Sequence, residues 1–191
     1  MVNVTGAELL EALEASTFAL PKSLGGFPQI AGMNISIDAT KKYDANADTY
    51  PGSTYYGPKS INRVTIESIN GKPFDKDATY AVITNDFLAA GGDIYYAFAA
   101  ASSQIESGLS LDTVVMDYIT DELKGTVTEE AYGQPAGRIT VDQGLAFTDV
   151  AATSPYYDGI EWAVDEGITN GTTATTFSPY QNCTRAQIIT Y

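Results

Sequence analysis

Histidine is absent from this sequence of 191 residues, and cysteine occurs only once, at Cys183. Without histidine, the chain cannot form a Ser-His-Asp or Cys-His catalytic arrangement or a histidine-ligated metal site. With one cysteine, it can form neither an internal disulfide nor a zinc site built from several cysteines. These two absences exclude those catalytic arrangements and those metal sites.

Basic residues are also scarce, with 10 Lys and Arg against 24 Asp and Glu, for a formal net charge of −14. This balance argues against binding to duplex nucleic acid or to an anionic membrane, because both depend on many cations. An anionic ligand would need a local cluster built from few cations, and the arginines are Arg63, Arg138 and Arg185. No apolar run approaches the roughly 18 residues of a membrane span, and no signal peptide is expected at the N-terminus.

What is present describes a folded chain, with 44% apolar residues and 13 tyrosines. Thr5 and Glu8 form a capping box that predicts a helix over about 6–17. Alternating apolar residues predict strands at 29–38, 61–69, 79–84 and 138–141, and helical spacing predicts an amphipathic helix over about 111–124. Strands interrupted by helices, with a hairpin signal at Asn70-Gly71, favour an α+β fold with a mixed sheet.

The stretch Thr79–Phe98 organises the first part of the chain. It begins as a strand expected to be largely buried, turns at Gly91-Gly92-Asp93 and continues into aromatic residues. Adjacent glycines let a ligand or another chain segment approach the backbone closely. Two interpretations stay open at this stage, a ligand-facing edge and a structural turn into a buried helix.

The pattern changes after Gly144, which divides the chain into residues 1–143 and 144–191. A helix is expected over about 156–166 and carries Trp162. Thr184 is a natural cap for another helix, and the chain ends only about two turns after the start of that helix. The last residues of the chain therefore indicate a partial module.

Five ordered blocks in the first part carry a resemblance to a known family: Val4–Leu10, Gly26–Met33, Val64–Asp75, Tyr80–Asp93 and Gly137–Ile139. The chain here resembles the C-terminal, substrate-binding domain of the 5′-nucleotidase, UDP-sugar hydrolase and 2′,3′-cyclic phosphodiesterase family. The resemblance implies an α+β domain with packed helices that recognises a nucleoside or nucleotide.

The resemblance also implies which residues contact substrate. Tyr95 corresponds to one of two rings that hold the base, and Gly92, Asp93 and Asn85 complete the candidate substrate-binding set. The bare residues also allow packing for Tyr95, capping by the Asp93 carboxylate and structural hydrogen bonding for Asn85. The family has a glycine where this chain has Ile94, and a β-branched residue takes a positive φ only at high cost. We therefore expect Ile94 to alter the turn.

In the resembled family, a separate N-terminal domain holds a pair of divalent metals, which activate water and clamp the phosphate. We expect the catalytic domain, and the second ring of the pocket, to precede Met1. This chain by itself is then expected to contain no catalytic residue, no metal and no cofactor, and its own N-terminal catalytic domain is an expected partner.

Residues from about 146 onward resemble one surface-layer homology (SLH) module, on the motifs Phe147–Val150, Tyr156–Ala163, Gly167–Gly171, Phe177–Pro179 and Thr184–Gln187. The resemblance implies attachment to a bacterial cell-wall polysaccharide, with Arg185 facing an acidic sugar and Trp162 as a stacking surface. Core packing is the alternative for Trp162. An extracellular, cell-surface or cell-wall location follows from this resemblance.

Together these expectations describe the nucleoside-recognition part of a secreted, wall-anchored 5′-nucleotidase-type phosphoesterase. One alternative is a surface scaffold that has lost nucleotide recognition, and another is a purely structural surface-layer protein.

Overall fold

The computed structural model describes residues 1–183 and divides the chain into a first unit, Met1–Asp142, and a second unit that begins at Gln143. Arg185, the predicted contact to an acidic sugar, lies outside the described residues.

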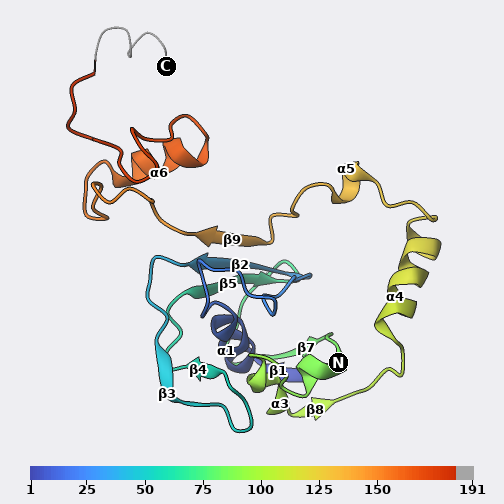
Figure 1. Ribbon diagram of the computed structural model, residues 1–191. Coiled ribbons are helices and arrows are strands. Elements are labelled where there is room, and N and C mark those ends of the chain that lie inside the picture. Colours follow the sequence, from blue (N-terminus) through green and yellow to red (C-terminus); the bar gives the residue numbers. More distant parts are fainter. Residues whose placement is uncertain (184–191) are drawn as a thin grey trace. The chain divides into compact units, whose positions relative to one another are not determined.

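The first unit combines three sheets with short helices (Figure 1). The strand order is β7-β1-β8 in one sheet, β6-β5-β2-β9 in the second and β3-β4 in the third. Strand β9 pairs parallel to β2, whereas the other neighbours are antiparallel. The predicted α+β fold with a mixed sheet is therefore confirmed. The elements are β1 (Val2–Thr5), α1 (Gly6–Ser16), β2 (Met33–Asp38), β3 (Ala45–Thr49), β4 (Tyr56–Pro58), β5 (Val64–Ile69), β6 (Lys72–Pro73), β7 (Thr79–Val82), α2 (Asp86–Ala89), α3 (Tyr96–Ala99), β8 (Ser103–Gln104), α4 (Leu111–Asp117), the π-helix η1 (Tyr118–Glu122), α5 (Glu129–Tyr132) and β9 (Ile139–Asp142).

Helix α1 is the centre of the core in this unit. Its predicted capping box is present, because the Glu8 N–H donates to Thr5 Oγ1 at 3.2 Å and the Thr5 N–H donates to Glu8 Oε2 at 2.7 Å. The helix lies between the β2–β5 sheet and the β1–β7 sheet (Figure 1). Both sheets contribute buried aliphatic residues to one core with α1, including Val2, Val4, Leu9, Leu13, Ile35, Ile37, Val64 and Ile66.

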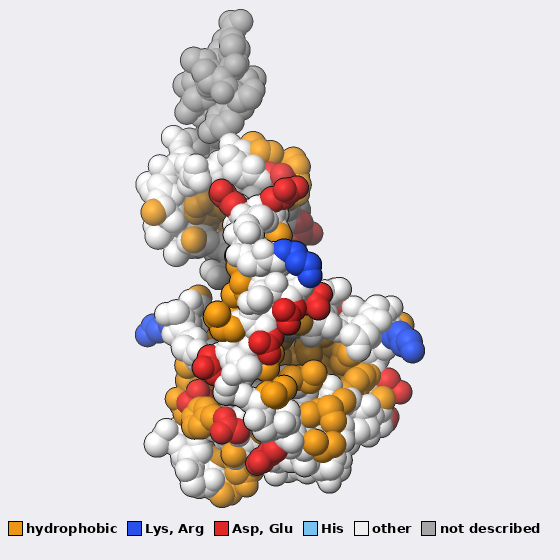
Figure 2. All heavy atoms as spheres, turned by 90° about the vertical axis from the view of Figure 1, so that its right-hand side faces the viewer, with side chains coloured by type: hydrophobic (Ala, Val, Ile, Leu, Met, Phe, Trp, Pro, Cys, Tyr) orange, Lys and Arg blue, Asp and Glu red, His pale blue; other side chains and the backbone are white. Residues whose placement is uncertain are grey.

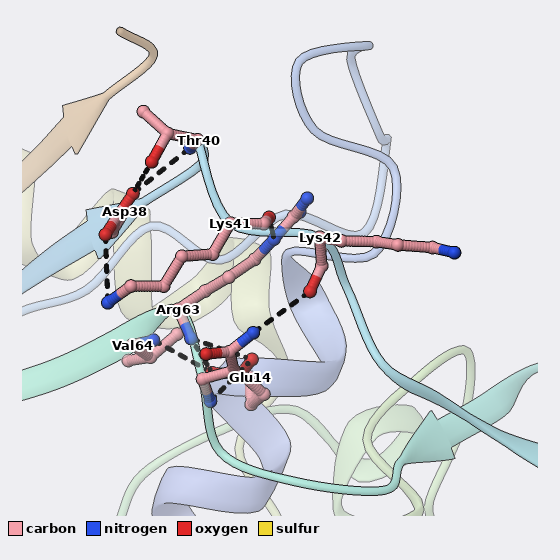
Figure 3. Close-up of polar contacts among 8 residues, drawn as sticks. Glu14, Asp38, Thr40, Lys41, Lys42, Arg63 and Val64 are labelled. Carbon is pink, nitrogen blue, oxygen red and sulfur yellow. Dashed lines mark hydrogen bonds and ion pairs between the residues drawn. The ribbon is translucent and has the colours of Figure 1, made fainter. Parts of the chain in front are cut away.

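A buried carboxylate joins α1 to the start of β5 (Figure 3). Glu14 is fully buried, and its two oxygens accept the backbone N–H groups of Asn62, Arg63 and Val64 at 2.8–3.2 Å. The Arg63 side chain is also buried and donates to the carbonyl oxygens of Lys41 and Thr17. These hydrogen bonds fix the end of the long connection between β2 and β5 against the helix.

Three segments differ from the sequence-based expectation. Strand β7 ends at Val82, and Ile83 beyond it is 88% exposed although the pattern predicted a largely buried strand to residue 84. The buried helix that one interpretation placed after the Gly-Gly-Asp turn is only the single turn α3, Tyr96–Ala99. The helix expected over 111–124 forms as α4 and η1, but most of its apolar side chains are exposed, including Leu111, Val114, Val115 and Tyr118. Figure 2 shows hydrophobic and acidic side chains together on this face of the first unit.

The second unit has a small core of its own around helix α6 (Tyr157–Asp165). Phe147, Val150 and Ile160 are buried, and Phe177 packs against them with its ring 5.5 Å from that of Phe147. A Cβ on Gly171 would lie 2.5 Å from the Phe147 ring, so only glycine fits there. This second core therefore contains few buried side chains.

Candidate functional site

Steric contacts and backbone conformation require glycine in the Gly91-Gly92-Asp93 turn. A Cβ on Gly92 would lie 2.6 Å from both the ring and the carbonyl oxygen of Phe87, and Gly91 has a φ of 85°. The Gly92 N–H donates to the Phe87 carbonyl at 2.8 Å and closes the turn after α2. The two glycines therefore serve local packing, and both are partly exposed.

Tyr95 faces the core. It is 3% exposed, its ring stacks on Phe98 at a centroid distance of 5.5 Å, and its hydroxyl donates to the Gly26 carbonyl at 2.7 Å. Burial, and to a smaller extent the charge of Asp93, raises the pKa of the Tyr95 hydroxyl. The hydroxyl thus stays protonated and ties the Gly25-Gly26 loop to the turn.

Asp93 carries the strained backbone of the turn, with a φ of 52°. Ile94 follows it without a positive φ and is 1% exposed, so the left-handed conformation in this turn falls on Asp93. Among the described residues the Asp93 carboxylate has no hydrogen-bond partner, and the cap of α3 is Tyr95 without any side-chain bond, so Asp93 does not cap that helix. One carboxylate oxygen lies 3.4 Å from where a Cβ on Gly26 would stand.

Asn85 has a structural hydrogen bond. It is the N-cap of α2, and its Oδ1 accepts the Leu88 N–H at 2.8 Å. The structure therefore brings Gly92, Asp93 and Tyr95 together with the Gly25-Gly26 loop and leaves Asn85 exposed at the preceding cap.

Two aromatic residues near the turn are more exposed than Tyr95 and were not singled out by the sequence. Phe87 is 56% exposed and covers Gly92, and Tyr96 is half-buried and stacks on Tyr50 at 4.7 Å. The Tyr50 hydroxyl contacts Glu11 Oε1 at 3.4 Å, and burial raises the pKa of that carboxyl group. In the sequence, the position of Phe87 shortly before the Gly91-Gly92 pair could have marked it as a residue of the turn.

The second unit presents Trp162 at its surface. The indole is 59% exposed on α6 and does not belong to the core of Phe147, Val150 and Ile160. The Asp149 carboxylate accepts the N–H groups of Phe177 and Ser178 at 2.9 and 2.7 Å and so holds the loop that follows α6. The Phe177 hydrogen bond is the main cause that lowers the pKa of Asp149.

Within residues 1–183, no group of three or more Cys, Asp or Glu side chains is arranged to hold a metal ion. The helices in the same range include none that is both long and apolar enough to cross a membrane.

Comparison with known families agrees with both parts of the chain. Residues 1–100 match the family described as 5′-nucleotidase, C-terminal domain, and residues 146–189 match the S-layer homology domain. The first match covers more than half of the chain, and the chain therefore belongs to the 5′-nucleotidase C-terminal domain family. It carries an S-layer homology domain after it.

Individual relatives support this assignment. The chain is 33% identical over 126 residues to the trifunctional nucleotide phosphoesterase protein YfkN of Bacillus subtilis, which spans 65% of this chain and 7% of that protein. It is 30% identical over 121 residues to a snake venom 5′-nucleotidase of Crotalus adamanteus, covering 62% of this chain and 19% of the relative. It is 31% identical over 123 residues to the cell wall protein Lmo0130 of Listeria monocytogenes, covering 64% and 13%.

A solved structure shares the fold. The 5′-nucleotidase precursor from Thermus thermophilus matches with a TM-score of 0.54 and 27% identity, over 73% of this chain and 24% of that one. The chain thus spans less than a quarter of the length of each of these four relatives.

Proposed function

We propose that this chain supplies nucleoside recognition and wall attachment to a 5′-nucleotidase-type phosphoesterase. The observation that carries the first part is the junction of the Gly25-Gly26 loop with the Gly92–Tyr95 turn. Partly exposed glycine backbone beside a carboxylate that has no hydrogen-bond partner among the described residues suits the hydroxyl and amino groups of a nucleoside.

The buried Tyr95 side chain, which is hydrogen-bonded to the Gly25-Gly26 loop, is also part of the proposed nucleoside site. A base could stack on its ring only if the Gly25-Gly26 loop moved, because the Tyr95 hydroxyl is bonded to Gly26 and the ring is buried. Stacking of this kind contributes about 1–3 kcal/mol where it has been measured. We therefore propose that Tyr95 positions Gly26 in the free chain and contacts the base in the complex.

Phosphoester hydrolysis is proposed for the whole protein and not for this chain. No metal-holding group lies among the described residues, and the named relatives are at least four times longer than the stretch this chain covers. A pair of divalent metals in a separate domain would activate water and clamp the phosphate. The chain would then bind and orient the nucleoside end of the substrate.

Adenosine titration of the isotope-labelled chain, followed by NMR, tests nucleoside recognition. We expect saturable shifts at Gly26, Gly92, Asp93 and Tyr95, and their loss in Asp93→Ala. Tyr95→Phe keeps the ring and removes the bond to Gly26, so it should shift the loop resonances before any ligand is added. Saturating adenosine without shifts at the turn would refute recognition by this chain.

The burial of Tyr95 and Ile94 favours a second candidate function, a surface scaffold that has lost nucleotide recognition. The same titration separates the two, since a scaffold shows no shifts at the turn.

Attachment to the cell-wall polysaccharide, with a location at the bacterial surface, is proposed for the second unit. It rests on the S-layer homology domain, on the exposed Trp162 and on the similarity to a cell wall protein. Sedimentation with purified wall sacculi should retain the chain, and Trp162→Ala and Arg185→Ala should each reduce that retention. Tyr132→Ala, an exposed aromatic of the first unit, is the matched control. Equal retention of all variants would refute this role for the two residues.

A further inference from the structure

Arg138 lines a small polar pocket at one end of the β6-β5-β2-β9 sheet. The pocket has a volume of about 170 Å³ and includes the residues Gly32, Asn34, Ser68, Asn70, Gly71 and Arg138. They come from the start of β2, the β5–β6 hairpin and the residue before β9. None of the residues that line it is an Asp or Glu, although the chain has 24 of them.

The guanidinium is held in place while its charge stays available. Arg138 Nε donates to the Ile30 carbonyl at 2.6 Å, and the Arg138 carbonyl accepts the Ile35 N–H at 2.9 Å. Within residues 1–183 its two terminal amino groups have no hydrogen-bond partner, and no carboxylate pairs with it. Arg63 is different, since it is buried and bonded to two carbonyl groups.

Two tight turns shape the opposite wall. Asn70 and Gly71 have φ values of 50° and 73°, and the Asn70 N–H donates to the Gly32 carbonyl at 2.7 Å. A Cβ on Gly32 would lie 2.9 Å from Asn70 Oδ1, so a larger residue there would push the Asn70 side chain away. Asn34 Nδ2 and Ser68 Oγ lie 3.3 Å apart and bring an amide and a hydroxyl to the same place.

We propose that this pocket binds a tetrahedral oxyanion, namely phosphate or a phosphomonoester group. A guanidinium with free terminal donors suits the paired oxygens of phosphate, and the neighbouring amide and hydroxyl groups supply further donors. The volume is well below the roughly 300 Å³ of a typical small-molecule site, which fits an ion and not a nucleoside. Because it uses other residues than the Gly-Gly-Asp turn, this inference stands without the proposed function.

Titration of the labelled chain with inorganic phosphate at constant low ionic strength tests the proposal, with the Arg138 Nε–H and the Gly32 and Gly71 amides as reporters. We expect saturable shifts at these groups. Arg138→Gln should weaken phosphate binding at least tenfold, because it removes the positive charge and the charge-assisted hydrogen bonds of the guanidinium. The phosphate affinity of Arg138→Lys should lie between those of the unchanged chain and of Arg138→Gln. Lysine keeps the positive charge but loses the paired donors of the guanidinium.

Lys22→Gln is the control for the change of charge, because Lys22 is an exposed cation that does not line the pocket. Ser68→Ala removes a hydroxyl that lines the pocket and leaves Arg138 unchanged, so a weaker phosphate affinity of this variant is expected as well. AMP distinguishes the source of the phosphate: tighter binding of AMP than of inorganic phosphate identifies a phosphomonoester, and the reverse identifies the free ion. Adenosine should leave the pocket reporters unchanged. Equal shifts with acetate or chloride, or undiminished phosphate binding in Arg138→Gln, would overturn the proposal.

Discussion

Some residues of this chain occupy positions where another side chain would clash with its neighbours or would leave hydrogen bonds unmade. Gly92 is needed because the Phe87 ring and carbonyl occupy the position of a Cβ. Glu14 is needed because three backbone N–H groups at the start of β5 converge on its two oxygens. Gly92 thus depends on a residue of the preceding helix, whereas Glu14 depends on a segment that is distant in sequence.

Gly92→Ala should disturb the turn. An added methyl group would meet the Phe87 carbonyl at 2.6 Å, and forcing it in should lower the free energy of unfolding by about 1–3 kcal/mol. Gly25→Ala is the matched control, because nothing lies within 4 Å of its Cβ position. Urea denaturation of both variants provides the comparison. Equal stability of the two would contradict the packing described for the turn.

Glu14→Gln should destabilise the first unit. The amide keeps one acceptor oxygen and turns an NH₂ group toward backbone N–H donors, in a fully buried position. We expect a loss of about 3 kcal/mol in the free energy of unfolding. Glu67→Gln on exposed surface should change it by less than about 0.5 kcal/mol. A neutral Glu14→Gln would show that the connection between β2 and β5 is held by other contacts.

At the scale of elements, the same apolar pattern leads to two different outcomes. Helix α1 buries Leu9 and Leu13 between two sheets, whereas α4 leaves Leu111 and Met116 exposed. Both helices follow from their sequence periodicity, but only the tertiary contacts of α1 turn that periodicity into burial.

Leu9→Ala and Leu111→Ala make this contrast measurable. The first should cost about 2–5 kcal/mol, because Leu9 is 2% exposed in the core. The second should cost less than about 0.5 kcal/mol, because Leu111 is 69% exposed. Chemical denaturation gives both values. Comparable losses would mean that α4 packs against the core in solution.

The loop after α6 should depend on pH through Asp149. Its pKa is lower in the folded unit than the ordinary value of 3.8, since the carboxylate accepts the Phe177 and Ser178 N–H groups. Its contribution to stability is therefore present above that ordinary value and is lost as the pH falls through the lower, folded value. Trp162 is the single tryptophan of the chain and reports unfolding of the second unit by fluorescence. Asp149→Asn should remove this part of the acid sensitivity, and an unchanged pH profile would contradict the assignment.

At the scale of the whole molecule, the chain consists of two units with separate cores. The first core is built on α1 and two sheets, and the second on Phe147, Val150 and Ile160. Strand β9 ends the first unit at Asp142, and the second core begins five residues later. Sequence composition had indicated a change of character at Gly144.

Limited proteolysis should cleave first between Asp142 and Phe147. The backbone there belongs to no strand or helix, whereas 61–90 carries strands that pair within the first unit. Mass spectrometry of the early fragments identifies the cut. Early cleavage within 61–90 would contradict the division into these two units.

The sequence by itself determined the α+β class, the capping box of α1, the Asn70-Gly71 hairpin and both family resemblances. These depend on local spacing and on ordered motifs, which are properties of the chain as written. Tertiary structure decided that Tyr95 is buried and tied to Gly26, that the positive φ falls on Asp93, and that Arg138 joins Asn34, Ser68 and Asn70 in one pocket. No local pattern contains such information, because burial and convergence depend on which distant segments pack together.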